Sequence, residues 1–282
     1  REEIARLEPA LGRLRAGDAR DAVAALLGRR PPLGPIHVVH FGRPYARTLV
    51  GGGALVPPGR EPESLWPTRI HEWLHAFDPS AEALALYEAL GKRDDWVGAR
   101  RRAILADHHS SNEEEMVLGA ELALSVRLGL STRPQAFRRA AVAYGGAPVA
   151  AFLLDRLLRG GSAIPYDEVV RGELRALLDG PDVSARYAAL VRPVSGTTGM
   201  RLEIRGGRPV VAFVAADSPA ARAGIEPGDA IRSIEGRDPP AALAEVVEAL
   251  VGPAGEDVGI VLERGGCARE VRLVRGRLPG LP

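Results

Sequence analysis

The chain of 282 residues contains a single cysteine, Cys267, and this scarcity excludes several kinds of site. One cysteine forms no intrachain disulfide and builds no thiolate zinc site, so a bound metal would take its ligands from His, Asp and Glu. An excess of charge of one sign is also missing, because 37 Lys and Arg against 36 Asp and Glu leave a formal net charge of +1. The composition therefore gives no indication of nucleic acid or of an anionic membrane as a partner.

Long apolar runs and phosphate-binding loops are lacking as well. No apolar stretch approaches the length of a membrane span, and no signal-peptide pattern opens the chain. The glycines at 51–53 are not followed by the Lys-Ser/Thr pair of a phosphate loop, so we expect a tight connection between strands there. Because the sequence begins at Arg1 without Met, we expect its natural N-terminus to have been removed, with room for a leader or an upstream domain.

A His-Glu-Trp-Leu-His sequence at residues 71–75 is the most informative pattern present. If residues 68–78 are helical, His71 and His75 lie one turn apart on the same face and can reach a single Zn²⁺. Glu72, beside the first imidazole, can then take a proton from an attacking water. The pattern indicates a zinc peptidase, and its alternative is a chance match in a helix that merely packs the two apolar residues between.

The hydrophobic period changes near residues 193–198, which predicts two regions. In the N-terminal region, the apolar pattern predicts short helices within 1–28 and strands at 36–42 and 47–56. The rest of this region is expected to be helical, with helices at about 68–78, 80–91, 96–106, 112–128, 134–143, 147–159, 166–178 and 182–190. Thr68, which follows Pro67, is expected to cap the motif helix. In the C-terminal region, the pattern predicts strands at 200–205, 209–215, 229–234, 257–263 and 269–275, with helices at 218–223 and 240–251. Together they predict an α+β protein with domains over 1–192 and 198–277.

TGMRLEI at residues 198–204 and VVAFVAADSPAARAGIEPGDAIRSIEGR at 210–237, with the helix and two strands that follow, resemble a PDZ domain of the bacterial type. Such domains take an extended peptide as an added strand between a strand and a helix. The resemblance implies a groove for a peptide C-terminus or a partner protein, with the 240–251 helix as one wall. Its other wall would be formed by Gly199, Met200, Arg201 and Leu202. The alternative is a packing domain whose groove is empty or filled by its own chain.

A catalytic zinc usually takes three protein ligands and one water, so the motif needs a third ligand. Asp94 is separated from His75 by eighteen residues, the spacing common among gluzincins. The other candidates are His108 and His109, Glu121, and the cluster Glu113, Glu114 and Glu115 in the first turn of the 112–128 helix. Acidic residues in a first turn also stabilise the helix dipole, so their position alone does not assign a metal.

EEMVLGAELALSVRLGL at 114–130 resembles the ligand helix of PDZ-bearing glycyl-aminopeptidase-like metallopeptidases, relatives of the aminopeptidase-N clan of gluzincins. In that family a zinc-binding Glu opens a helix that ends in an Arg-x-Gly-Leu turn. Alignment on this turn assigns the third ligand to Glu114, whereas alignment on the Asn-x-x-Glu pattern of other zincins assigns it to Glu115; we expect Glu114, with Glu115 as the alternative. The resemblance implies a mainly helical, thermolysin-like zincin domain with a short N-terminal sheet, Zn²⁺ as cofactor, and a peptide or protein substrate.

AYGGAPVAAFLLDRLLRGG at 143–161 is similar to the family's Tyr-x-Lys-Gly segment. The similarity gives Tyr144 the role of hydrogen-bond donor to the oxyanion of the tetrahedral intermediate, and we expect His108 to assist it. The chain also departs from the family, since Gly146 and Ala147 replace the Lys and Gly, and the interval between Glu114 and the tyrosine is much shorter.

The family's edge strand carries a glutamate that holds the free amine of an aminopeptidase substrate, and residues 51–55 contain no acid. A buried ammonium without a carboxylate would be costly to bind, so we expect endopeptidase or relaxed specificity. The alternatives are a catalytically degenerate PDZ scaffold or adaptor, and a peptide-binding helical domain without metal. The family implies an extracytoplasmic location, periplasmic or secreted, if a leader was removed.

Overall fold

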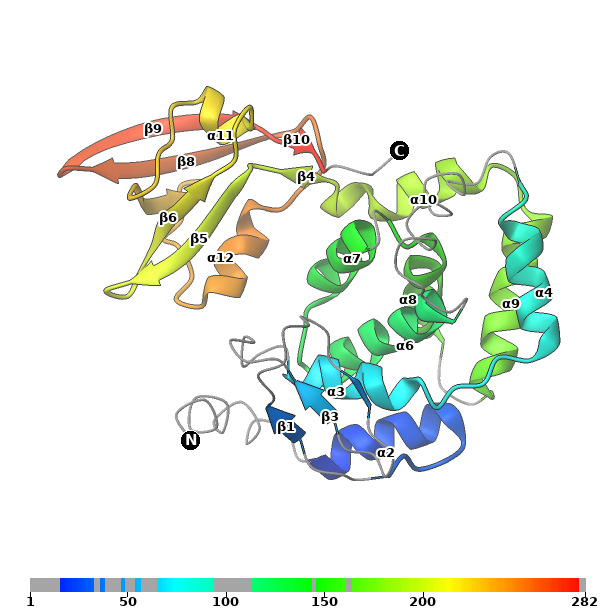
Figure 1. The fold of residues 1–282 in the computed structure, drawn as a ribbon. Helices are drawn as coiled ribbons and strands as arrows, with labels where there is room; N and C mark the ends of the chain where they lie inside the picture. Colours follow the sequence, from blue (N-terminus) through cyan, green and yellow to red (C-terminus); the bar gives the residue numbers. More distant parts are fainter. Residues whose placement is uncertain are drawn as a thin grey trace. The chain divides into compact units, whose positions relative to one another are not determined.

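The computed structural model describes residues 16–32, 36–38, 47–48, 54–56, 65–93, 113–143, 146–160 and 164–278. The chain divides into two compact units (Figure 1). Unit 1 consists of Arg1–Ala136 and Ala147–Tyr187, and unit 2 of Phe137–Gly146 and Ala188–Pro282. The first is mainly helical and the second is mainly β-sheet, so the expected mixture of α and β structure is confirmed.

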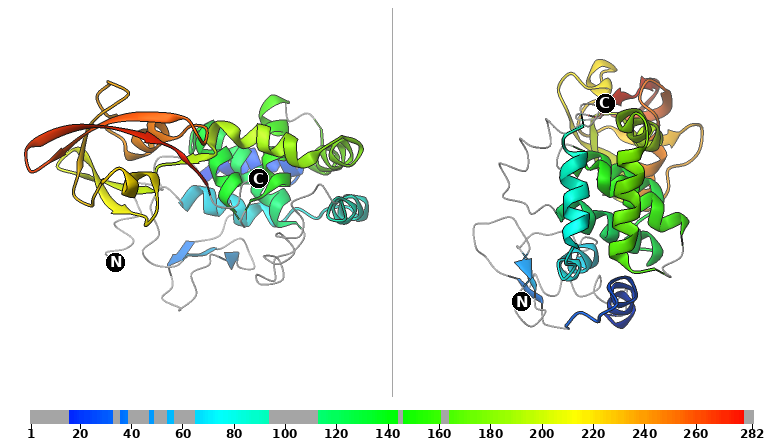
Figure 2. Two further views of the ribbon diagram at one scale, coloured as in Figure 1. Left: turned by 90° about the horizontal axis from the view of Figure 1, so that it is seen from above. Right: turned by 90° about the vertical axis from the view of Figure 1, so that its right-hand side faces the viewer.

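Unit 1 combines helices with a short sheet. Its helices are α2 (Ala16–Leu27), α3 (Leu65–Leu74), α4 (Ala81–Leu90), α6 (Glu114–Arg127), α8 (Pro148–Arg159) and α9 (Tyr166–Asp179), and it shares α7 (Arg133–Val142) and α10 (Val183–Val191) with unit 2. In the sheet, β3 (Ala54–Val56) lies between β1 (Ile36–Val38), to which it is parallel, and β2 (Arg47–Thr48), to which it is antiparallel. Helices α4 and α9 lie side by side (Figure 2).

Helices α6 and α8 form the centre of unit 1. Every residue of α6 from Glu115 to Ser125 is buried, and so is the face of α8 that packs against it. Gly119 allows the close approach, because a Cβ atom there would lie 2.9 Å from Leu153 Cβ and 3.0 Å from the Ala150 carbonyl oxygen. Helix α3 packs on α6 as well, which brings the motif helix next to the acidic first turn of α6.

The motif helix differs from the expected one at both ends. Helix α3 begins at Leu65, so Thr68 lies inside it and is buried, and the predicted cap is wrong. The helix can begin before Pro67 because proline is tolerated in a first turn, where the N–H groups have no helical partner. The helix ends at Leu74, yet the His75 N–H still donates to the His71 carbonyl at 3.3 Å, so the two histidines keep their one-turn spacing.

Unit 2 is built around a five-stranded antiparallel sheet in the order β5-β6-β7-β8-β9. Its strands are β5 (Met200–Arg205), β6 (Arg208–Val214), β7 (Ala230–Ile234), β8 (Asp257–Arg264) and β9 (Cys267–Val274). The remaining elements are the 3₁₀ turn η3 (Arg192–Val194), the pair β4 (Gly196–Thr197) and β10 (Gly276–Arg277), and helices α11 (Pro219–Arg222) and α12 (Leu243–Leu250).

The core of unit 2 follows the period of two expected of half-buried strands. In β8 the residues Val258, Ile260 and Leu262 are buried, and they share a core with Val246 and Leu250 of α12. These contacts place α12 on the sheet and beside β5, the end strand among the described residues.

Most expected elements of the described chain occur within a few residues of their predicted positions. The expected strand 47–56 is present as two paired strands, β2 and β3. The expected helix at 96–106 and most of the expected first helix lie outside the described residues. Within the described part of the chain, no helix has the length and apolar character needed to span a membrane. The thermolysin-like zincin fold stays a prediction.

Candidate metal centre

The structure brings His71, His75 and Glu114 together. The Glu114 carboxylate lies 3.5 Å from His71 Nε2 and 3.6 Å from His75 Nε2, and one ligand atom from each of the three residues falls within 4.8 Å of the others. Two ligands held at about 2.1 Å from the same ion in tetrahedral geometry lie about 3.4 Å apart. The distance from the Glu114 carboxylate to each imidazole is therefore close to the separation of two ligands on one zinc ion.

Helical geometry accounts for the positions of all three side chains. His71 and His75 leave the same side of α3, and their ring centroids are 4.9 Å apart. Glu114 is the first residue of α6, which packs on α3. Glu113, one residue earlier, places an oxygen 3.4 Å from His75 Nδ1. The centre thus combines two nitrogen donors with carboxylates, which is chemistry that suits Zn²⁺.

Glu121, one of the candidate ligands from the sequence, lies beside the other nitrogen of the His71 ring. Its side chain has no solvent exposure, and its oxygen lies 3.3 Å from His71 Nδ1. A carboxylate on the second ring nitrogen orients a metal-ligating imidazole and leaves the Nε2 lone pair for the ion. The detectable signal was its position seven residues after Glu114, two helical turns along the same face.

The two carboxylates dominate the electrostatics of His71. Burial by itself lowers the pKa of His71, but hydrogen bonds with Glu114 and Glu121 and their negative charges outweigh burial and raise the pKa to about 9. The site therefore stabilises a cation at the imidazole, whether a proton or a metal ion.

Glu115, the rival third ligand, has a different environment. Its side chain is buried, and Oε2 accepts the N–H groups of Val149 at 2.7 Å and Ala150 at 3.4 Å, in the first turn of α8. Its Oε1 accepts the hydroxyl of Tyr87 at 3.4 Å. A carboxylate at a helix N-terminus satisfies backbone donors that have no partner within the helix. The structure thus brings Glu114, not Glu115, to both imidazoles.

The predicted base, Glu72, follows His71 on α3 and is partly exposed. Its negative charge acts on Arg69, whose guanidinium lies 4.9 Å from the centroid of the Trp73 ring. Burial lowers the pKa of Arg69, and the charge of Glu72 opposes this shift.

Several other sequence candidates lie outside the described residues. They are Tyr144, Asp94, His108, His109 and the glycines 51–53. The oxyanion role of Tyr144 accordingly stays a prediction.

The predicted peptide-binding residues open β5 in unit 2. Gly199 has φ +79°, and a Cβ atom there would lie 2.2 Å from Ser218 Cβ, so both the conformation and the space require glycine. Met200 and Arg201 follow on the end strand, with the Arg201 guanidinium 5.9 Å from the centroid of the exposed Phe213 ring. Leu202 points into the core. An end strand beside a helix is the arrangement to which an extended peptide can add.

Comparisons with known proteins identify the class of the C-terminal module. Residues 210–264 match the family model of the PDZ domain, and the β-sheet of unit 2 is consistent with that domain. The chain therefore contains a PDZ domain. No match to a curated protein was found.

Similar solved structures include proteases and one of their isolated domains. The PDZ domain of a carboxy-terminal protease from Vibrio cholerae, in complex with a peptide, is 24% identical over 30% of this chain and 96% of that chain, with a TM-score of 0.27. A serine endoprotease from Yersinia pestis is 28% identical over 32% of this chain and 33% of that chain, with a TM-score of 0.27. An aminopeptidase N family protein from Idiomarina loihiensis is 12% identical over 98% of this chain and 63% of that chain, with a TM-score of 0.34.

The chain thus spans less than two thirds of the length of the endoprotease and of the aminopeptidase N family protein.

Proposed function

We propose that the chain is a zinc-dependent peptidase whose PDZ domain binds a peptide or a partner protein. The observation that carries this proposal is the convergence of His71, His75 and Glu114, with the buried Glu121 behind the first imidazole. Two histidines one turn apart and a glutamate from a second helix form the ligand set of many zinc peptidases.

His71, His75 and Glu114 are the residues that would hold Zn²⁺. When bound, the ion supplies Lewis-acid chemistry by acidifying water and polarising the scissile carbonyl. Glu72 acts as the general base, taking a proton from the attacking water and passing it to the leaving amine. Tyr144, assigned from the family resemblance, donates a hydrogen bond to the oxyanion, with His108 as a second donor.

The expected substrate is a peptide or protein held by its backbone rather than by its free amine. Residues 51–55 contain no carboxylate for an N-terminal ammonium, so endopeptidase or relaxed specificity is proposed. In the PDZ domain, residues 199–202 and α12 would hold a peptide C-terminus as a strand added to β5.

The test is peptide hydrolysis by the wild-type chain and by Glu72→Gln. Wild-type protein is expected to hydrolyse unstructured peptides, to lose activity with a chelator and to regain it with zinc. Glu72→Gln is expected to keep its zinc and lose turnover, because the amide accepts no proton. Full activity in this variant would remove Glu72 as the base. Zinc-loaded wild-type protein that cleaves no peptide would support the alternative, a PDZ scaffold.

A further inference from the structure

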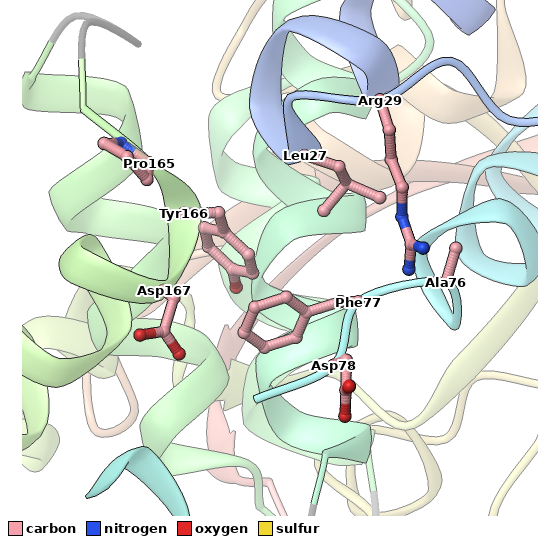
Figure 3. Close-up of a pocket in the computed structure, with 8 residues that line it drawn as sticks. All are labelled: Leu27, Arg29, Ala76, Phe77, Asp78, Pro165, Tyr166 and Asp167. Carbon is pink, nitrogen blue, oxygen red and sulfur yellow. The ribbon is translucent and has the colours of Figure 1, made fainter. Parts of the chain in front are cut away.

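Unit 1 contains a cavity of about 270 Å³ that is separate from the candidate metal centre (Figure 3). It lies between the end of α2, the segment that follows α3, and the start of α9. None of His71, His75 and Glu114 lines it. Its lining residues are Leu27, Arg29, Ala76, Phe77, Asp78, Pro165, Tyr166 and Asp167.

One side of this cavity is apolar and fixed in place. The rings of Phe77 and Tyr166 pack against each other at an interplanar angle of 57°, with centroids 4.8 Å apart, and both residues are buried (Figure 3). The Tyr166 hydroxyl donates to the Met116 carbonyl oxygen at 2.6 Å, which holds the ring in position. Leu27 and Pro165 extend the apolar lining. Such a surface accepts an aliphatic or aromatic group at low conformational cost, because its own side chains are already ordered.

The polar side of the cavity carries one positive and one negative side chain that form no polar contact with another described residue. Arg29 and Asp78 are exposed at the cavity, and neither forms a hydrogen bond or ion pair with another described residue. Asp167 differs, because it accepts the Ser80 N–H at 2.9 Å and pairs with Arg171 at 2.7 Å. A guanidinium and a carboxylate therefore remain for a ligand.

We propose that this cavity binds a small zwitterion with an apolar side chain, namely a free aliphatic or aromatic amino acid. Its carboxylate pairs with the Arg29 guanidinium, its ammonium pairs with Asp78, and its side chain rests on Phe77 and Tyr166. The volume agrees with this class: 270 Å³ lies just below the range of about 300–1,000 Å³ typical of drug-sized ligands, so it suits an amino acid better than a nucleotide. The balanced charge of the pair favours a zwitterion over a dianion.

The test is calorimetric titration of the 282-residue chain with L-leucine and with L-phenylalanine. Saturable binding of one molecule per chain is expected. Leucinamide, which lacks the carboxylate, and N-acetyl-leucine, which lacks the ammonium, should each bind at least about 10-fold more weakly, as should the variants Arg29→Gln and Asp78→Asn. Glycine, which has no side chain for the rings, should give no detectable binding.

Arg30→Gln is the matched control, because Arg30 is adjacent and exposed but pairs with Asp21 outside the cavity. It should bind leucine like the wild type, and so should protein treated with a chelator. The proposal is overturned if neither amino acid binds, if Arg29→Gln and Asp78→Asn both bind normally, or if the chelator abolishes binding. Equal binding of leucinamide or N-acetyl-leucine would also overturn it. These outcomes do not depend on whether the chain hydrolyses peptides.

Discussion

An oxygen of Glu121 lies 3.3 Å from Nδ1 of His71, although the two residues are separated by 50 positions and the glutamate side chain has no contact with solvent. The opposite nitrogen of the same ring faces Glu114 at 3.5 Å. His71 is thus held between two carboxylates of one helix. One of them is the proposed metal ligand, and the other lies where a carboxylate orients a ligating ring.

Replacing Glu121 should weaken zinc binding. In Glu121→Gln the amide keeps the size of the side chain but loses the charge that orients the imidazole, and outer-shell changes of this kind typically cost about 10- to 100-fold in metal affinity. Competition with a chromophoric chelator measures the affinity. Glu88→Gln, the same exchange at an exposed position of α4, is the control and should bind like the wild type. Equal affinity in the two variants would show that Glu121 has no orienting role.

Replacing Glu115 should reduce stability and leave zinc bound. The Glu115→Gln side chain keeps one acceptor oxygen and puts an amide NH₂ in place of the other. Either the N–H donors of Val149 and Ala150 or the Tyr87 hydroxyl then lose their acceptor. The expected loss in the free energy of unfolding is about 1–3 kcal/mol, measured by urea denaturation of metal-free protein. If this variant loses zinc while Glu114→Ala retains it, the assignments of the two glutamates must be exchanged.

The metal-free protein should become less stable as the pH rises through about 9. The pKa of His71 is raised from 6.5 to about 9 in the folded state. The contribution of protonated His71 to the free energy of unfolding is therefore fully present below pH 6.5, and it is lost as the pH rises through about 9. The contribution is at most about 3 kcal/mol. Urea unfolding of chelator-treated wild type and His71→Asn, compared below pH 6.5 and above pH 9, measures this contribution of His71.

A proton and a zinc ion compete for the same imidazole, so the apparent zinc affinity should increase with pH up to about 9. A stability difference between wild type and His71→Asn that does not change with pH would contradict the electrostatic account of His71.

The contact between α6 and α8 should not tolerate a side chain at position 119. In Gly119→Ala the new methyl group would lie 2.9 Å from Leu153 Cβ and 3.0 Å from the Ala150 carbonyl oxygen, so the helices must separate. The expected loss of stability is about 1–3 kcal/mol. Gly172→Ala is the matched control, because Gly172 is also helical and a methyl group added there would meet no atom within 4 Å; it should gain up to about 1 kcal/mol. Equal thermal stability of the two variants would argue against close helix packing.

The sequence predicted those features that depend on local spacing. The five-residue motif places two imidazoles on one helical face whether the helix begins at Leu65 or at Thr68, so the error at the N-terminus did not affect the histidine pair. In the PDZ domain, the helix predicted at 218–223 is present as α11, where Ser218 accepts the Ala221 N–H at 3.1 Å and Gly224 follows the helix with φ +67°.

The roles of the acidic residues could not be separated from the sequence alone. Glu113, Glu114 and Glu115 are equally compatible with the dipole of one first turn. Their environments differ because of helix packing. Backbone N–H groups of α8 donate to Glu115, whereas the histidines of α3 lie next to Glu114. That difference is tertiary, and no spacing within the segment encodes it.

The zinc content of the purified chain and the coordination of that zinc test the central claim most directly. We predict one zinc per chain, with X-ray absorption showing two imidazole nitrogens and carboxylate oxygen bound to the ion, and loss of the ion in Glu114→Ala. A chain that binds no zinc at equimolar concentration, or a Glu114→Ala variant with unchanged zinc content and coordination, would contradict this claim.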